Sequence, residues 1–243
     1  MPTQRYVSPE LTHFVGQGLS SEDQRYSLLV NDILKGGCLK FPPIDDSRCI
    51  EGLSGNLPIV GGTRTPDGDD TEAAYSQRIC FCDIPVTDLE IHMNKYSRFG
   101  LSFLKRFLIG KGANPVMYVA ENSQALSFRL PESTRDEPWS RRRVFERNIE
   151  LLEEYRRENR GKFPMYLEYF LDILVLPFIK YFDDSASDEH KANVYMEREW
   201  RVIGDVKFTL SDVHRVFMPE RYAERFRKDL PNYTGQLTFS DNT

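Results

Sequence analysis

The sequence lacks the short motifs that mark the commonest enzyme families. It contains no GxxxxGK[ST] phosphate-binding loop, no GxGxxG after a strand-like segment, no GxSxG and no HExxH. Nucleotide hydrolysis of the usual kind, Rossmann-type dehydrogenation and α/β-hydrolase chemistry are therefore disfavoured.

Cysteine is scarce and is not arranged for metal binding. The four cysteines are Cys38, Cys49, Cys80 and Cys82, with no CxxC pair and no histidine close to them in sequence. Cys80 and Cys82 are spaced so that both thiols face one side of a strand. A zinc site is therefore the weaker interpretation, and we expect free thiols packed in the core and no metal.

Excess positive charge and targeting signals are also missing. The formal net charge is −5, which argues against a general affinity for nucleic acid, although a local basic patch would supply it. The chain opens MPTQRYVSPEL, without the apolar core of a signal peptide. The most apolar long run, residues 163–182, carries Glu168, Asp172 and Lys180, so it predicts a buried helix and no membrane span. We expect a cytoplasmic protein.

Chemically versatile side chains are concentrated in the stretch of residues 78–119. Two apolar runs, residues 79–84 and 115–119, predict buried strands. The polar segment between them holds side chains that can move protons, stack on a ring or bind phosphate: His92, Lys95, Tyr96, Arg98 and Gly100. Gly100 lies in a further strand candidate, residues 99–103, and indicates a close backbone approach or a bulge.

Within this segment, residues 88–96 have helical spacing. Leu89, His92, Met93 and Tyr96 fall at i, i+3, i+4 and i+7, so His92 and Tyr96 share one helix face. A pair of reactive side chains on one face is compatible with a site. The plainer interpretation is that both are half-buried polar members of that face.

A second stretch, residues 195–202 (YMEREWRV), predicts a late strand that meets the first stretch in space. Alternation would place Glu197, Glu199 and Arg201 on one side, with both carboxylates at one rim. The alternative is that the two glutamates pair with Arg201 and its neighbours on an exposed edge.

The remaining chain predicts a single domain over residues 1–243. A helix begins at Ser20 or Ser21 and ends at Gly36-Gly37, a last strand covers residues 213–218, and a terminal helix covers 219–230 before a loose tail. Residues 44–77 are expected to form a long loop, either a lid over a pocket or a solvated insertion. Residues 133–184 are expected to form a helical insertion.

The ordered segments LTHFVGQGL, DILKGG, ICFCDIPVTDLEIHMNKYSRFGLSF, KGANPVMYV and EREWRV resemble the abortive-infection AbiGi family. Members of that family are described as antitoxins of bacterial phage-resistance toxin–antitoxin systems. The resemblance implies antiviral defence and a cognate toxin as partner.

The same order is more remotely similar to proteins related to ADP-ribosyltransferases. These carry a histidine on the first strand, a mid-chain tyrosine near a glycine, and a late E-x-E-x-R strand. The resemblance implies an α+β fold with a mixed or antiparallel split sheet. His13 would match the histidine, Tyr96 the tyrosine, and Glu197 or Glu199 the glutamate.

This second resemblance implies NAD as substrate. A carboxylate near the ribose would stabilise the positive charge that develops during cleavage, and an aromatic ring would stack on the nicotinamide. Arg98, Lys105 or Lys111 would meet the pyrophosphate. The chain departs from the family pattern, because it has no clear serine-threonine-serine strand and a lengthened spacing between Tyr96 and Glu197.

Three functions stay open on the sequence alone. The first is an ADP-ribosyltransferase acting on nucleic acid or protein, with Glu199, Glu197, Tyr96 and His13 as catalytic candidates. The second is a non-catalytic, antitoxin-like partner of a separately encoded toxin. The third is a sensor of a nucleotide or a phage component.

Overall fold

The computed structural model describes residues 8–40, 78–120, 170–182 and 193–241, with scattered positions between 151 and 190. The chain divides into two compact units. Unit 1 comprises Met1–Pro43, Gln77–Pro115 and Glu197–Thr243, and unit 2 comprises Ile44–Ser76 and Val116–Met196. The single domain expected over residues 1–243 remains a prediction, because a compact unit can be either a separate domain or an insertion within one domain.

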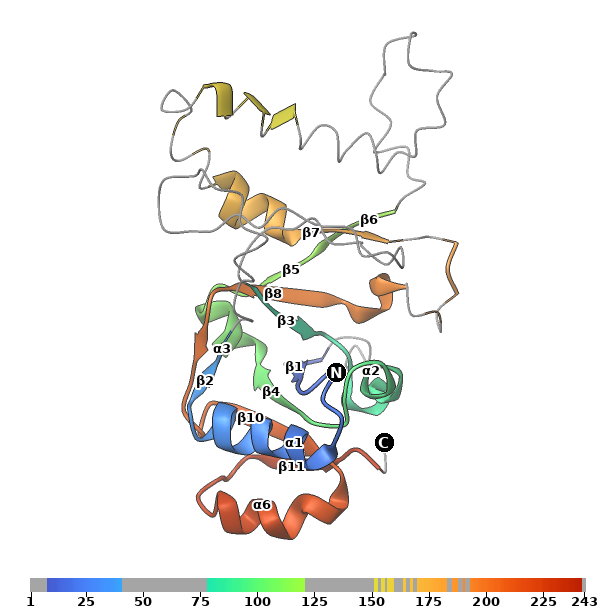
Figure 1. The fold of residues 1–243 in the computed structure, drawn as a ribbon, viewed down its shortest axis with the longest axis vertical. Helices are drawn as coiled ribbons and strands as arrows, with labels where there is room; N and C mark the ends of the chain where they lie inside the picture. The colour runs from blue at the N-terminus through green and yellow to red at the C-terminus, as the bar shows by residue number, and fades with distance from the viewer. Residues whose placement is uncertain are drawn as a thin grey trace, which may run out of the picture. The chain divides into compact units, whose positions relative to one another are not determined.

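A seven-stranded mixed sheet forms the centre of unit 1, in the order β11-β10-β4-β1-β3-β8-β5 (Figure 1). Its strands are β1 (Glu10–Phe14), β3 (Arg78–Cys82), β4 (Gly100–Leu104), β5 (Asn114–Pro115), β8 (Glu199–Ile203), β10 (Val213–Met218) and β11 (Gln236–Phe239). Neighbours are antiparallel except β10 and β11, which are parallel. With its helices this makes an α+β unit, so the predicted class with a mixed sheet is confirmed.

Short helices flank the strands at the places where the sequence carries start signals. Ser21 caps α1 (Glu22–Ser27) and exchanges hydrogen bonds with Gln24, and the helix continues as the π-helical η1 (Leu28–Leu34). The other helical elements of unit 1 are η3 (Val86–Asp88), α2 (Glu90–Lys95), α3 (Lys105–Gly110), η9 (Glu220–Tyr222) and α6 (Ala223–Asp229). A short antiparallel pair, β2 (Cys38–Leu39) and β9 (Val206–Lys207), completes the described part of the unit.

The two faces of the sheet carry separate apolar clusters. Leu11 and Phe81 belong to the large core, which also contains side chains of η1 and α6. Cys82 and Phe217 belong to a smaller cluster with Leu89 and Met93, and Phe14 packs against it. Because successive side chains of a strand point to opposite faces, Phe81 and Cys82 mark the two sides. The helix α2 covers the second side.

Two sequence predictions about elements of unit 1 are wrong. The expected strand over residues 195–202 begins only at Glu199, because η8 (Val194–Glu197) is a 3₁₀ turn and Arg198 adopts a φ of 45°. A residue with positive φ interrupts the extended backbone that strand pairing needs. The tail after Pro231, expected to be loose, contains β11, which pairs with β10 over residues 236–239.

Unit 2 contains a separate two-stranded parallel sheet of β6 (Met117–Ala120) and β7 (Ile179–Phe182). The helical turns η6 (Phe170–Val175) and η7 (Leu176–Phe178) precede β7. The helix expected through residue 182 therefore gives way to a strand at Ile179, after Pro177 in the last helical turn. The predicted lid over residues 44–77 lies outside the described residues. Most of the predicted insertion over residues 133–184 also lies outside them, although η6, η7 and β7 belong to it. No helix in the described ranges is long and apolar enough to cross a membrane.

Candidate functional site

Glu197 is the centre of a polar cluster on the side of the sheet that α2 covers. Its carboxylate accepts a hydrogen bond from Lys95 Nζ at 2.7 Å and another from the hydroxyl of Tyr96. The carboxylate arrives from η8 and the two donors from the end of α2. Glu197 is only 6% exposed. Charge-assisted hydrogen bonds are the strong kind, so they hold Glu197 against the end of α2.

Tyr96 serves this cluster as a donor. Burial raises the pKa of its hydroxyl above the usual value, and the negative charge of Glu197 raises that pKa further. Its ring is parallel to that of Phe14, with centroids 6.5 Å apart and an angle of 8° between the planes. The Lys95 ammonium lies 5.2 Å from the centroid of the Tyr96 ring. The ring is therefore already packed on one side and bonded at its tip.

Glu199 and Arg201 form a second, deeper ion pair. Arg201 Nε lies 2.6 Å from Glu199 Oε1, and Arg201 Nη2 lies 3.4 Å from Glu199 Oε2. The two residues are 4% and 1% exposed. Their strand partners on β3 are Cys82 and Cys80. The buried pair thus occupies the same side of the sheet as the two thiols.

The cysteines beside this pair are protonated thiols. Burial raises the pKa of Cys80 to about 12, and the charge of Glu199 contributes to the rise. Burial likewise raises the pKa of Cys82. Thiolates are the nucleophiles and metal ligands, so neither cysteine is poised for that chemistry. Both are free, as predicted, and the described residues contain no group of three side chains able to hold a metal ion.

His92 is a member of this site that the sequence did not single out as a site residue. It is 4% exposed, and neither ring nitrogen has a hydrogen-bond partner among the described residues. Its ring lies 6.4 Å from that of Tyr96. Burial lowers the pKa of the imidazole, although the nearby Glu197 carboxylate acts in the opposite direction. The helical spacing with Tyr96 was the signal that pointed to this position.

The structure does not bring His13 together with Tyr96 and the glutamates. Its Nδ1 donates to the carbonyl of Cys80 at 2.7 Å, and its ring lies 5.6 Å from that of Phe81. Phe14, the next residue, stacks on Tyr96 instead. Because neighbours on a strand alternate, His13 lies on the opposite face of the sheet. Burial lowers the pKa of His13, against the effect of the Cys80 carbonyl.

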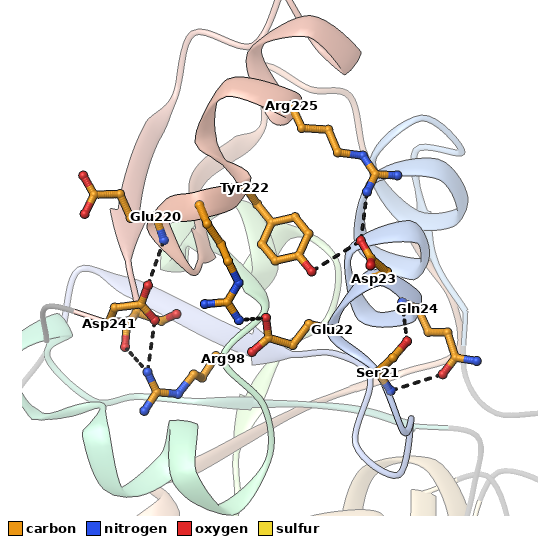
Figure 2. A network of polar contacts seen from close by, with 11 residues as sticks. Ser21, Glu22, Asp23, Gln24, Arg98, Glu220, Tyr222, Arg225 and Asp241 are labelled. Carbon is orange, nitrogen blue, oxygen red and sulfur yellow. Dashed lines mark hydrogen bonds and ion pairs between the residues drawn. The ribbon is translucent and has the colours of Figure 1, made fainter.

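Two of the three cations proposed for a pyrophosphate, Arg98 and Lys105, are also engaged elsewhere. Figure 2 shows Arg98 directed at Asp241, with Arg98 Nη1 3.1 Å from the Oδ1 atom of that residue. Lys105 Nζ lies 2.7 Å from Asp83 Oδ2 and 5.6 Å from the centroid of the Trp200 ring. Neither contact involves Glu197 or Glu199. Of the predicted set, the structure gathers Tyr96, Glu197 and Glu199, with Lys95, Arg201 and His92 added.

As arranged, the site is a group of buried acids whose charges are balanced by cations of the same unit. Such an arrangement fixes the chain segments that carry it. The geometry of the site therefore fits a buried cluster that stabilises the fold of this small α+β unit better than it fits an open catalytic cleft.

The family model described as "Putative abortive phage resistance protein AbiGi, antitoxin" matches residues 71–237. The match covers more than half of the chain, which therefore belongs to the AbiGi family, as the sequence motifs indicated. It includes Tyr96, Glu197 and Glu199 but begins after His13. No curated protein and no solved structure matches the chain.

Proposed function

We propose that this chain is the antitoxin component of a bacterial phage-resistance system and acts by binding a separately encoded toxin. The observation that carries the proposal is the AbiGi match over residues 71–237. In this role the folded chain needs a surface for its partner and no reaction of its own.

The geometry of the glutamates supports a non-catalytic role. Cleavage of NAD needs a carboxylate that reaches the ribose and stabilises a developing positive charge. Glu197 already has the Lys95 ammonium 2.7 Å away, and Glu199 has the Arg201 guanidinium at 2.6 Å. A cation at that distance offsets the negative field of the carboxylate. Both acids therefore direct their charge to partners inside unit 1.

The test is growth of bacteria that express the chain and the products of its flanking genes from separate promoters. We expect the chain alone to be harmless, one flanking product to arrest growth, and coexpression of the chain to relieve the arrest. Resistance to phage should require both proteins. If the chain alone arrests growth and Glu199→Gln relieves the arrest, it is the toxic component and the proposal is refuted.

A second candidate is ADP-ribosyl transfer from NAD to nucleic acid or protein, on a sheet of the ADP-ribosyltransferase type. The observation that favours it is the meeting of Tyr96 with Glu197, which follows it by 101 residues, and with the neighbouring Glu199. The assay is nicotinamide release from NAD by the purified protein, with and without bacterial lysate and phage nucleic acid.

Three variants decide this second candidate. An active enzyme should lose nicotinamide release with Glu197→Gln or Glu199→Gln when circular dichroism shows that the variant is still folded, and keep it with Glu220→Gln, which removes an exposed carboxylate of η9. No release by a folded wild-type protein in any of these mixtures excludes NAD cleavage and leaves the antitoxin role.

A further inference from the structure

Three aromatic rings of unit 2 pack against one another at the surface. The ring centroids of Tyr118 and Phe182 are 6.3 Å apart, those of Tyr118 and Tyr195 are 5.2 Å apart, and those of Phe182 and Tyr195 are 4.9 Å apart. Tyr195 is 52% exposed, although both neighbours contact it. We call these three residues the aromatic triad.

Two members of the aromatic triad lie on one face of the two-stranded sheet of unit 2. Tyr118 pairs with Lys180 and Ala120 pairs with Phe182, so Tyr118 and Phe182 lie on the same face. Val119 and Ile179 lie on the other face, where Val175 packs against Ile179. Tyr118 and Phe182 therefore lie on the face opposite the small apolar cluster, together with Lys180, which is 5% exposed.

Unit 2 also carries most of the exposed apolar side chains of the described residues. Six of the eight large exposed hydrophobic residues belong to it: Met117, Leu151, Tyr155, Leu167, Phe170 and Tyr195. Concentrated exposed apolar side chains are typical of interaction surfaces, and packed tyrosines are frequent among the residues that dominate binding energy.

The two units differ in charge, and the difference indicates which partner fits. By sequence, unit 2 contains 22 acidic and 14 basic residues, a net charge of −8, whereas the rest of the chain contains 15 acidic and 18 basic residues, a net charge of +3. A negative unit attracts a basic partner and accelerates its association. It repels nucleic acid, and it repels the same unit of a second copy.

We infer that the aromatic triad of unit 2 is the surface on which a basic protein docks, and that this protein is the cognate toxin. The inference rests on the proposed function and adds to it the place and chemistry of the contact. Arginine and lysine side chains of the toxin would stack on the exposed ring of Tyr195, where a cation is attracted by the face of the ring. The acidic unit would supply the long-range attraction.

The test uses the full chain and the flanking gene product that arrests growth, with affinity measured by titration calorimetry. Tyr195→Ala should weaken binding by about tenfold or more, as expected for an aromatic residue at the centre of an interface. Ile109→Ala removes a side chain that is 54% exposed in unit 1 and should leave the affinity unchanged. Binding should also weaken as the salt concentration rises.

Charge substitutions test whether the partner surface is basic. Tyr195→Lys should weaken binding more than Tyr195→Glu, because a lysine repels a basic partner and a glutamate attracts it. The inference is overturned if Tyr195→Ala binds as tightly as Ile109→Ala, or if the glutamate variant is the weaker of the two. It is also overturned if sedimentation shows that the triad joins two copies of this chain.

The two proposals fail in different ways. If wild-type protein binds the toxin and Tyr195→Ala binds it equally well, the antitoxin role stands and the triad is not the contact. If wild-type protein does not bind the toxin at all, the proposed function itself is refuted.

Discussion

The Arg201 side chain is 1% exposed and lies against an acid that is 4% exposed. Two charges removed from water are stable when they pair with each other and their remaining polar atoms are hydrogen-bonded. The register of β3 and β8 places Arg201 opposite Cys80 and Glu199 opposite Cys82, so the pair is enclosed by the sheet it belongs to. A change at either residue should therefore act on folding first.

Arg201→Met should lower the free energy of unfolding by about 3–5 kcal/mol, because it leaves the Glu199 carboxylate buried beside an apolar side chain. The double variant Glu199→Gln with Arg201→Met should recover part of this loss, because the uncompensated charge is gone. Urea unfolding of the three proteins measures both effects. A double variant no more stable than Arg201→Met would show that the pair is not the source of the loss.

His92 should make stability decrease as the pH falls below 6.5, the ordinary pKa of the group. Its folded pKa is lowered from 6.5, so the unfolded chain binds the proton more readily than the folded chain. Stability is then fully present above the unfolded pKa and decreases as the pH falls through it towards the folded pKa. Because His13 is shifted in the same direction, the wild-type loss is the sum of both residues.

The variant His92→Phe isolates the share of His92. It removes the titrating group, and neither ring nitrogen has a hydrogen bond to lose among the described residues. We expect a smaller loss of stability between pH 7.5 and pH 5.5 than in wild type, measured by urea unfolding. Met93→Leu, in the same helix, should behave as wild type. An unchanged pH dependence in His92→Phe would contradict the assignment.

At the scale of elements, the contact between β1 and β4 depends on a glycine. Gly100 pairs with Phe14, and a Cβ added at Gly100 would lie 2.8 Å from the carbonyl oxygen of His13 and 3.1 Å from Phe14 Cδ1. Backbone cannot move aside as a flexible side chain can. The close approach predicted from the sequence at this glycine is thus confirmed.

Gly100→Ala should destabilise the protein by about 1–3 kcal/mol, because the added methyl group separates β1 from β4. Gly110→Ala is the matched control, since a Cβ at Gly110 meets no atom within 4 Å. That substitution should be neutral or slightly stabilising. Thermal unfolding of both variants checks the difference, and similar shifts in the two would refute the steric explanation.

Elements with strong periodicity could be predicted from the sequence, whereas elements set by single residues could not. The strand β10 occupies the predicted residues 213–218, and α2 lies within the predicted residues 88–96. The late strand was placed too early because nothing in YMEREWRV announces the positive φ of Arg198. The strand β11 was missed although Gln236, Leu237, Thr238 and Phe239 alternate as a half-buried strand does.

The site was predictable in part for the same reason. Residue types and spacing indicated Tyr96 and the two glutamates, and the structure gathers them. Sequence gave no means to assign the partners, since Tyr96 and Glu197 are 101 residues apart. Strand alternation places His13 and Leu11 on the same face of β1. Alternation alone could not show which face of β1 meets α2, and so could not show that His13 lies on the face opposite Tyr96.

At the scale of the molecule, unit 1 is assembled from three chain segments, and unit 2 is formed from the two segments between them. Pro115 pairs with Trp200 in the antiparallel contact of β5 and β8. The chain therefore leaves unit 1 before residues 116–196, the longer segment of unit 2, close to the place where it returns. A short flexible linker is able to span that distance.

Replacing residues 117–195 with a short Gly/Ser linker should therefore leave unit 1 folded, because its sheet keeps all seven strands. We expect a single cooperative unfolding transition by circular dichroism and no binding of the toxin, since the aromatic triad is gone. Loss of cooperative unfolding would show that unit 1 needs residues 117–195 to fold. Retained toxin binding would place the contact outside residues 117–195.

The position of β1 has a consequence for how the protein is made. Among the described strands of this sheet, β1 comes first in the chain and lies in the middle, whereas β11 comes last and lies at an edge. The partner of β11, β10, pairs with β4, which is distant from it in sequence, and such pairings are slow to form. The sheet cannot close while its final strand is still inside the ribosome. Folded unit 1 therefore requires that synthesis has passed β11, and a chain stalled before that strand contributes none.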